Sequence, residues 1–244
     1  VWMVDKQRLF DTARKHNPDV AIVANGTVDH GYEFCSKEVG SPAGKDYGFA
    51  TDAPDVRNED AKTWPGYRRQ VALICGSNWW ASIGGGPRFS ARDVALYTVL
   101  QSAVNRDGGG VAWSFGTYAD GSFETGLLDR MRDAWKYLKP IQQAVLNTVP
   151  SSAYPTPEHT TVKGLERGFV ATQSVDGKTT YIHVLRPPQT DELILPRPAD
   201  ARAFKGASLV GQKGKVTLSS GSDGIRVKVS AAWSEFDTVI ALRT

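Results

Sequence analysis

Residues 108–147 read GGGVAWSFGTYADGSFETGLLDRMRDAWKYLKPIQQAVLN and join a strand pattern to a helix pattern. The apolar run VAWSFG follows three glycines and has the length of a buried strand. The helix that follows is predicted to carry one apolar stripe, formed by Leu128, Met131, Trp135, Leu138 and Val145. Pro140 should kink or divide this helix, because proline lacks the backbone N–H and clashes with the preceding turn. A strand followed at once by a helix is the repeating unit of parallel sheets.

The same order of strand and helix fills the rest of residues 1–150. The predicted strands are VWMVD at the start, DVAIVANG at 19–26 and QVALICGSNWW at 70–80. The predicted helices are residues 5–17, with Asp5 as N-cap, and residues 90–105, opened by Ser90. Repetition of this unit predicts a parallel sheet that is either open or curled into a barrel.

The period changes beyond residues 151–160, a Pro- and Ser/Thr-rich segment that we interpret as a linker. Residues 168–185 contain two alternating runs around Asp176-Gly177, which is a strong hairpin signal. The further short strands are ELILP, ASLVG, KVTLSS, GIRVKVS and DTVIALR, each bounded by Gly, Pro or Asp. Residues 161–244 are therefore predicted to form an antiparallel β-sandwich domain.

The composition argues against several classes of protein. Among 244 residues, 29 basic and 26 acidic side chains are interspersed and give a net charge of +3, so we expect no nucleic-acid partner and no membrane binding. No apolar run approaches the roughly 20 residues that span a bilayer. Cys35 and Cys75 lack further ligands at zinc-site spacing, and the glycine-rich runs lack the spacing that cradles phosphate. We expect neither a metal nor a cofactor.

Four segments together carry a resemblance to a known family. They are HNPDVAIVANG at 16–26, GSNWW at 76–80, NRDGGGVAWSFGTYADGSFE at 105–124 and WKYLKPIQQAVLNTVPSSAYPT at 135–156. In this order they resemble the C-terminal half of the α-L-fucosidase family of glycoside hydrolases, family twenty-nine. Members of that family place a (β/α)₈-like catalytic barrel before a β-sandwich. The resemblance thus implies an α/β partial (β/α)₈-type barrel over residues 1–150, followed by the sandwich.

The strand count departs from the complete family pattern. At most five barrel strands can be counted in residues 1–150, and an eight-stranded barrel cannot close with that number. An open parallel edge would leave backbone N–H and C=O groups unpaired. We therefore expect an upstream N-terminal barrel segment, or another chain, to complete the barrel.

The resemblance also implies an activity. The chain would belong to an exo-acting, retaining glycosidase that removes a terminal α-L-fucosyl or related sugar from a glycan. A periplasmic or secreted location is favoured by the same resemblance. Two alternatives stay open: a non-catalytic carbohydrate-binding protein on this scaffold, and a glycosidase with a different sugar specificity.

Glycoside hydrolysis requires two carboxyl groups, one to protonate the leaving oxygen and one to attack the anomeric carbon or activate water. In a barrel such groups stand at the carboxyl ends of the strands. Residues 27–40 follow the strand at 19–26 and are expected to form a loop there. By the resemblance, Glu38 corresponds to the acid/base, and Glu33 is the rival candidate.

Asp5 ends VWMVD and is the candidate nucleophile, because its position at a strand end is suitable. Its competing role is the N-cap of the following helix, and the glycine expected after the nucleophile is Lys6 here. If Asp5 is only a cap, the nucleophile lies in a part of the protein that this chain lacks.

Three further residues are candidates for sugar binding. Trp79 and Trp80 end a predicted strand, where an indole could stack on the apolar face of a sugar ring, although both rings could instead fill the core. His30 is a candidate hydrogen-bond partner of a sugar hydroxyl, or simply an exposed loop residue. Trp113 is expected to fill the barrel core, and Asp120-Gly121 is expected to form a turn.

Overall fold

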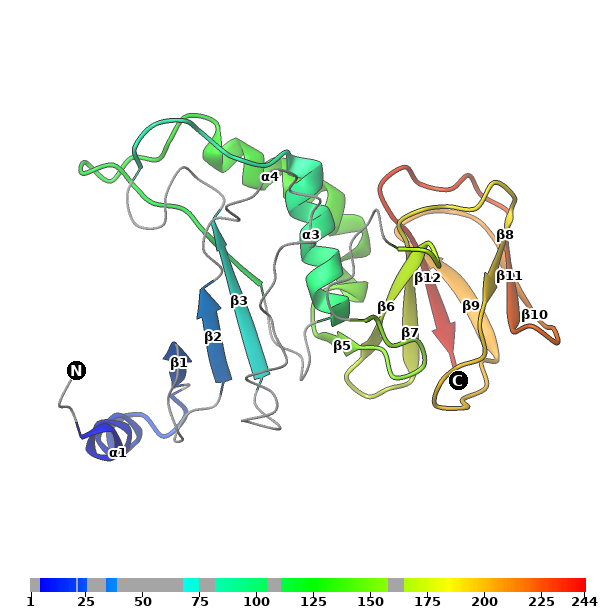
Figure 1. The fold of residues 1–244 in the computed structure, drawn as a ribbon, viewed down its shortest axis with the longest axis horizontal. Coiled ribbons are helices and arrows are strands. Elements are labelled where there is room, and N and C mark those ends of the chain that lie inside the picture. Colours follow the sequence, from blue (N-terminus) through cyan, green and yellow to red (C-terminus); the bar gives the residue numbers. More distant parts are fainter. Residues whose placement is uncertain are drawn as a thin grey trace.

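The computed structural model describes residues 5–20, 22–25, 34–38, 68–74, 82–104, 111–157 and 165–244. It is a mixed α/β structure in which a parallel sheet and two antiparallel sheets lie on opposite sides of a pair of helices (Figure 1). Within the described part of the chain, every helix is too short or too polar to cross a membrane.

The first sheet is parallel, as predicted from the repeated strand and helix order. Its strands are β1 (Val23–Asn25), β2 (Phe34–Glu38), β3 (Arg68–Ile74) and β4 (Val111–Ser114), side by side in that order. All three pairings are parallel. The carboxyl ends of these four strands therefore point towards one edge of the sheet. Among the described residues the sheet is open, so the predicted partial barrel stays a hypothesis.

One strand was not expected. Residues 27–40 were predicted to form a loop, but Phe34–Glu38 is β2 and pairs with both β1 and β3. The prediction was wrong for these five residues because FCSKE has no strand period, and its extended backbone is held by hydrogen bonds to strands on either side.

The helices begin where the sequence predicts. They are α1 (Lys6–His16), α3 (Ala91–Val104), α4 (Leu127–Leu138) and the 3₁₀ helix η2 (Lys139–Ala144). Ser90 Oγ accepts a hydrogen bond from the backbone N–H of Asp93, while Asp93 Oδ2 accepts one from the backbone N–H of Ser90. This reciprocal pair starts α3. Pro140 divides the last helix as expected, because the α-helical hydrogen bonding changes to 3₁₀ around it.

The predicted apolar stripe of α4 is not one buried stripe. Leu127, Ala134 and Leu138 are buried, whereas Leu128 and Trp135 are 38% and 41% exposed. The small Ala134 packs in the cluster that joins α4 to α3. Helical spacing placed the larger side chains towards the core, but the close approach of the two helices selects the smaller one.

The C-terminal strands form two antiparallel sheets, as predicted. The five-stranded sheet has the order β5 (Thr148–Pro150), β6 (Phe169–Ser174), β7 (Thr179–Val184), β12 (Thr238–Arg243) and β9 (Gly206–Val210). The three-stranded sheet has the order β10 (Val216–Ser220), β11 (Ile225–Val229) and β8 (Glu192–Leu195). The β6–β7 hairpin turns at Asp176-Gly177, where Gly177 has φ +71°. This arrangement is an antiparallel β-sandwich.

The five-stranded sheet is covered on both faces. One face packs against the three-stranded sheet through a core that includes Phe169, Ile182 and Val227. The other face packs against α3 and η2, and its side chains Val170 and Val239 share a core with Leu100 of α3. The helices of the first half and the sandwich of the second half are thus joined by one continuous apolar cluster.

The connecting residues take part in the sandwich. β5 pairs with β6, so the hydrogen bonding of the five-stranded sheet begins at Thr148. Ala153 and Tyr154 are buried between the sheets, at 1% and 2% exposure. The division at residue 150 and the linker at 151–160 stay predictions about domain organisation.

Trp113 lies on the helix side of the parallel sheet. Its ring makes edge-to-face contacts with Tyr97 of α3, at 5.5 Å between centroids, and with Phe89, at 6.1 Å. Its indole N–H donates to Thr98 Oγ1 at 3.2 Å. The expectation that it fills the barrel core is therefore wrong, because its side chain packs between sheet and helix.

Buried tyrosine makes the fold sensitive to alkaline pH. Burial raises the pKa of Tyr97 above its ordinary value. An unfolded tyrosine loses its proton at about pH 10. Above that pH the unfolded state holds fewer protons than the folded state, so stability falls as pH rises.

We expect Tyr97→Phe to reduce this loss above about pH 10, where an unfolded tyrosine ionises and the buried one does not. The measurement is the free energy of unfolding in urea at several pH values. Tyr118→Phe, at a residue 37% exposed, is the matched control and should keep the wild-type slope. Equal slopes for Tyr97→Phe and wild type would contradict the prediction.

Candidate functional site: the carboxyl edge of the parallel sheet

The predicted acid/base residue lies at the edge of the parallel sheet where active sites of such sheets form. Glu38 is the last residue of β2, and its Cα pairs with that of Ala72 in β3. β3 ends at Ile74, opposite Ser114, the last residue of β4. The backbone of Glu38 therefore stands at the same edge as the segments that follow β3 and β4.

Two described segments meet at this edge. Ser82, in the segment after β3, donates from its hydroxyl to Gly116 O at 2.8 Å and from its backbone N–H to Thr117 O at 3.0 Å. In the segment after β4, the rings of Phe115 and Phe123 pack edge to face at 5.4 Å. These contacts hold the two segments together, so the edge near β4 has a defined shape.

Asp120 forms the predicted turn at this edge. Its Oδ1 accepts hydrogen bonds from the hydroxyl and the backbone N–H of Ser122, at 2.7 and 2.9 Å. These bonds favour the carboxylate and lower the pKa of Asp120, which is fully exposed. Gly121 follows with φ +84°, which suits glycine. Asp120 thus stabilises its own turn, as expected.

Glu124 is a buried carboxyl at the same edge that the sequence did not single out. It is only 3% exposed and precedes α4, where its carbonyl accepts from Leu127 N at 3.1 Å. Its position in GSFETG looks like that of a solvated turn residue. Its burial comes from the folding of the β4–α4 segment, so the local sequence pattern does not predict it.

Asp5 is the N-cap of α1. Its Oδ1 accepts a hydrogen bond from Arg8 N at 3.0 Å, and the residue is exposed. Figure 1 shows α1 beside the end at which β1 begins, with the arrowheads of β2 and β3 directed away from it. The capping role is therefore confirmed, and the nucleophile role stays a prediction.

The other candidates lie outside the described residues. These are Glu33, His30, Trp79 and Trp80. For Glu38 the description covers the backbone and not the side chain. In the parts of the chain that are described, His, Cys, Asp and Glu form no group of three or more that could hold a metal ion.

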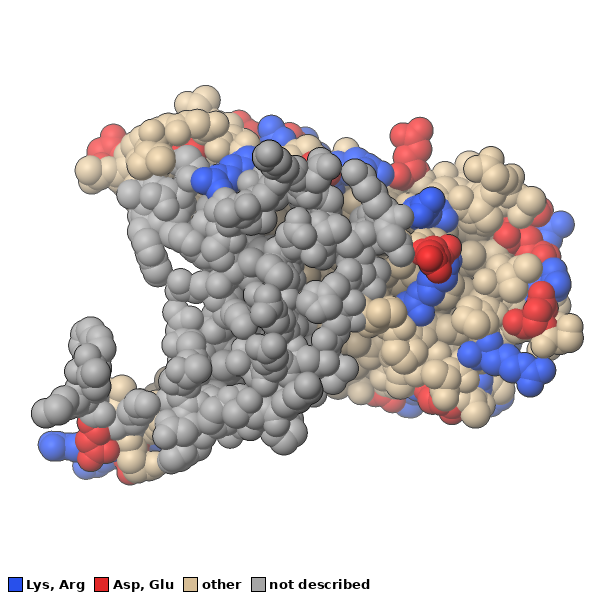
Figure 2. Space-filling model, viewed as in Figure 1, with Lys and Arg blue, Asp and Glu red and all other residues tan. Residues whose placement is uncertain are grey.

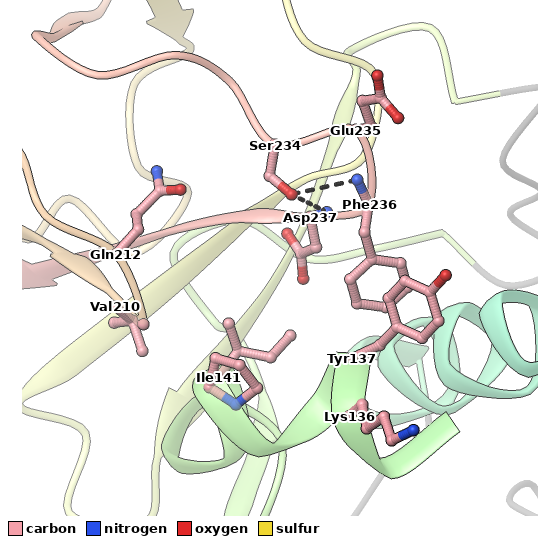
Figure 3. A pocket seen from close by; sticks show the side chains of 11 residues that line it. Lys136, Tyr137, Ile141, Val210, Gln212, Ser234, Glu235, Phe236 and Asp237 are labelled. Atoms are coloured by element: carbon pink, nitrogen blue, oxygen red, sulfur yellow. Dashed lines mark hydrogen bonds between the residues drawn. The ribbon is translucent and has the colours of Figure 1, made fainter. Parts of the chain in front are cut away.

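A separate cavity of about 360 Å³ lies where the helices meet the sandwich (Figure 3). Its walls come from the end of α4, from η2, from the turn after β9 and from the segment that leads into β12. No residue of the parallel sheet lines it.

A buried His–Asp pair lies behind this cavity. His183 Nδ1 is 2.7 Å from Asp237 Oδ2, and both side chains are fully buried. On the other side of the ring, Nε2 is 3.1 Å from Ala144 O and 3.3 Å from Thr172 Oγ1. The Thr172 hydroxyl donates its hydrogen to Ala144 O at 2.7 Å. The network joins η2 to β6, to β7 and to the residue that precedes β12.

Both ring nitrogens of His183 face hydrogen-bond acceptors. Nδ1 faces a carboxylate oxygen, and Nε2 faces a carbonyl oxygen and the lone pairs of a hydroxyl whose hydrogen is already used. A neutral imidazole has only one N–H and would leave one of these contacts without a hydrogen. The arrangement therefore fits an imidazolium paired with the Asp237 carboxylate.

The described surface has no single-sign patch on the face drawn in Figure 2. Over the sandwich, basic and acidic side chains are interspersed. Arg226, for example, lies 2.8 Å from Glu192 and 3.0 Å from Asp223. Such surface pairs stabilise little individually and create no field for a polyanion.

Comparison with known proteins shows the fold. No protein-family model matches the chain, and no curated protein matches it. Solved structures do: alpha-L-fucosidase isoenzyme 1 from Paenibacillus thiaminolyticus superposes with a TM-score of 0.68 at 18% identity, covering 98% of this chain and 53% of that one. For a GH29 alpha-L-fucosidase from Bacteroides thetaiotaomicron, trapped as a covalent intermediate, the TM-score is 0.68 at 16% identity, over 97% of this chain and 51% of the other.

A third example is the alpha-fucosidase of Thermotoga maritima, with a TM-score of 0.63 at 13% identity, over 98% of this chain and 48% of that one. The chain thus spans about half the length of the solved structures that it matches. Its fold is that of part of the α-L-fucosidases, and the structural resemblance inferred from the sequence motifs is confirmed. At these identities the likeness concerns the fold alone.

The buried pair yields a prediction about stability. Asp237→Asn leaves the His183 cation without its counter-charge, so the free energy of unfolding should fall by about 3–5 kcal/mol. Asp191→Asn is the matched control, because Asp191 pairs with Lys228 at 3.1 Å on the surface with both side chains more than half exposed. That exposed pair should contribute about 0–1 kcal/mol.

Urea unfolding of the two variants and of wild type makes the comparison, and proton NMR of the wild type should show both ring N–H signals of His183. A single ring N–H signal, together with equal losses in the two variants, would refute the ion pair.

Proposed function

We propose that this chain is the C-terminal part of a glycoside hydrolase that removes a terminal α-L-fucosyl or related sugar. The observation that supports it most is the order of a parallel sheet, two helices and a β-sandwich, which superposes on about half of several α-L-fucosidases. The placement of Glu38 at the carboxyl edge of the parallel sheet agrees with this proposal.

In the proposed reaction Glu38 is the acid/base. Its carboxyl group donates a proton to the glycosidic oxygen while a carboxylate nucleophile attacks the anomeric carbon and the bond to the leaving group breaks. The Glu38 carboxylate then takes a proton from water, whose oxygen attacks the same carbon and releases the sugar and the nucleophile. Two inversions retain the configuration. Glu33 is the alternative acid/base.

Asp5 is the proposed nucleophile. A retaining mechanism needs its carboxyl about 5–5.5 Å from that of the acid/base. That requires the N-terminus of α1 to be presented at the carboxyl edge of the sheet. Trp79 and Trp80 would stack on the sugar, and His30 would bond a hydroxyl. If Asp5 acts only as a cap, the nucleophile is supplied by the segment that completes the barrel.

We propose that such a completing segment exists, in the same polypeptide or in another chain. The four described parallel strands leave a sheet open, and an open parallel sheet exposes unpaired backbone groups. Leu128 and Trp135 on α4 add exposed apolar surface that a neighbouring helix would bury. Together these features favour a partial (β/α)₈-type barrel.

A non-catalytic carbohydrate-binding protein is the second candidate. The observation in its favour is the cap at Asp5, whose carboxylate already accepts the Arg8 N–H at 3.0 Å. A scaffold without a carboxyl pair would bind sugar and leave its glycosidic bond intact.

Glu38→Gln tests the catalytic proposal. On an aryl α-L-fucoside with a poor leaving group, the variant should lose about 10²- to 10⁴-fold in kcat/KM, because proton donation is missing. On a dinitrophenyl fucoside the dinitrophenolate leaves without protonation, so the rate of the first step should fall much less. The assay uses the chain alone and together with any encoded upstream segment.

Glu33→Gln serves as the matched control and should behave as wild type if Glu38 is the acid/base. A Glu38→Gln variant with wild-type activity on both substrates refutes the assignment. Sugar binding with no turnover of any aryl glycoside by the wild type supports the binding protein instead.

Two substitutions separate the roles of Asp5. Asn caps helices as well as Asp, so Asp5→Asn keeps the cap and removes the nucleophile, whereas Asp5→Ala removes both at a cost of about 0.5–2 kcal/mol in stability. If Asp5 is the nucleophile, both variants lose turnover. If it is only a cap, Asp5→Asn keeps both activity and thermal stability, and only Asp5→Ala melts earlier.

A further inference from the structure

The cavity between the helices and the sandwich has one aromatic wall. Tyr137 of α4 and Phe236 lie with ring centroids 4.8 Å apart, and Tyr137 is 39% exposed while Phe236 is buried. Ile141 and Val210 form the floor. A volume of about 360 Å³ is at the lower end of pockets that hold small ligands, and the walls come from packed elements.

Two buried polar atoms of the cavity walls have no hydrogen-bond partner among the described residues. One is Asp237 Oδ1, a carboxylate acceptor, and the other is Gln212 Nε2, an amide donor. Figure 3 shows the Asp237 carboxylate between the Gln212 side chain and the two aromatic rings. A buried donor or acceptor without a partner destabilises the folded state, so a ligand towards which both side chains turn would remove that loss by bonding to both atoms.

The local charges favour a neutral ligand. The Asp237 carboxylate is already engaged by the His183 ring through its other oxygen, at 2.7 Å. Lys136 Nζ pairs with Asp133 at 2.7 Å, outside the cavity. Glu235 is exposed, and in Figure 3 its carboxylate points away from the cavity. No uncompensated charge among these groups is directed into the space, and a cation would gain no counter-charge there.

The rim of the cavity is fixed by a close backbone approach. Gly211 has φ +77°, and a Cβ at this position would come within 2.6 Å of Pro140 O. Only glycine therefore lets the turn after β9 press against η2. This contact holds the turn that carries Gln212 against η2.

We propose that this cavity binds a neutral sugar or similar polyol, at a site distinct from the carboxyl edge of the parallel sheet. A hydroxyl group can donate to Asp237 Oδ1, and a hydroxyl oxygen can accept from Gln212 Nε2. The apolar C–H face of the ring packs on Tyr137. The site uses neither Glu38 nor Asp5, so it would hold a glycan without cleaving it.

The test is binding of L-fucose, D-galactose and D-glucose, measured by calorimetry and by NMR titration of the labelled full chain. Gln212→Met removes the amide donor at nearly constant volume, and Tyr137→Ala removes the exposed ring. Each should weaken binding about 5- to 10-fold, the effect of one lost hydrogen bond or ring contact. Gln189→Met, at an exposed residue away from the cavity, should leave binding unchanged.

The same titrations on Glu38→Gln separate this site from the catalytic one. Binding that survives Glu38→Gln and weakens in Gln212→Met supports the proposal whether or not the chain cleaves glycosides. Binding that is lost with Glu38→Gln and unaffected by Gln212→Met overturns it. Absence of binding for all three sugars, or shifts with tetramethylammonium at this site in place of sugar, also overturns it.

Discussion

The pairing of His183 with Asp237 is the interaction on which the junction of this molecule depends. It is buried at the centre of the five-stranded sheet, and through Nε2 and Thr172 it reaches the carbonyl of Ala144 at the end of η2. A buried ion pair is costly unless its remaining donors and acceptors are satisfied. That requirement fixes where η2 lies on the sheet, and Pro140, in the first turn of η2, divides this 3₁₀ helix from α4.

The shared core follows from that junction. Because η2 and α3 cover one face of the five-stranded sheet, its strands are apolar on both sides, as the largely buried β6, β7 and β12 show. His183 is one of the few polar side chains on the helix face, and it brings its own counter-charge. The second carboxylate oxygen of Asp237 lies at the wall of the cavity that Tyr137 also lines. The same network thus joins the two halves and shapes the pocket.

The likeness to α-L-fucosidases at 13–18% identity has a physical basis in this packing. Backbone pairing and apolar periodicity tolerate many side-chain changes, whereas a reaction depends on a few groups held within ångströms. The order of four motifs between residues 16 and 156 indicated the fold, and residues 105–156 gave the most specific match. The groups that decide activity, Glu38, Glu33 and Asp5, need their own test, because the strand order alone does not bring two carboxyls together.

The sequence by itself determined the elements with strong local signals: the cap at Asp5, the start of α3 at Ser90, the break at Pro140, the Asp176-Gly177 hairpin and the short C-terminal strands. It failed where partners distant in the chain decide. FCSKE forms β2 between two other strands, Ala134 rather than Trp135 packs at the helix contact, and the Trp113 ring packs against Tyr97 of α3. Only the tertiary structure placed Gln212 and Asp237 on one cavity and His183 beside Asp237, because residues far apart in sequence leave no period to read.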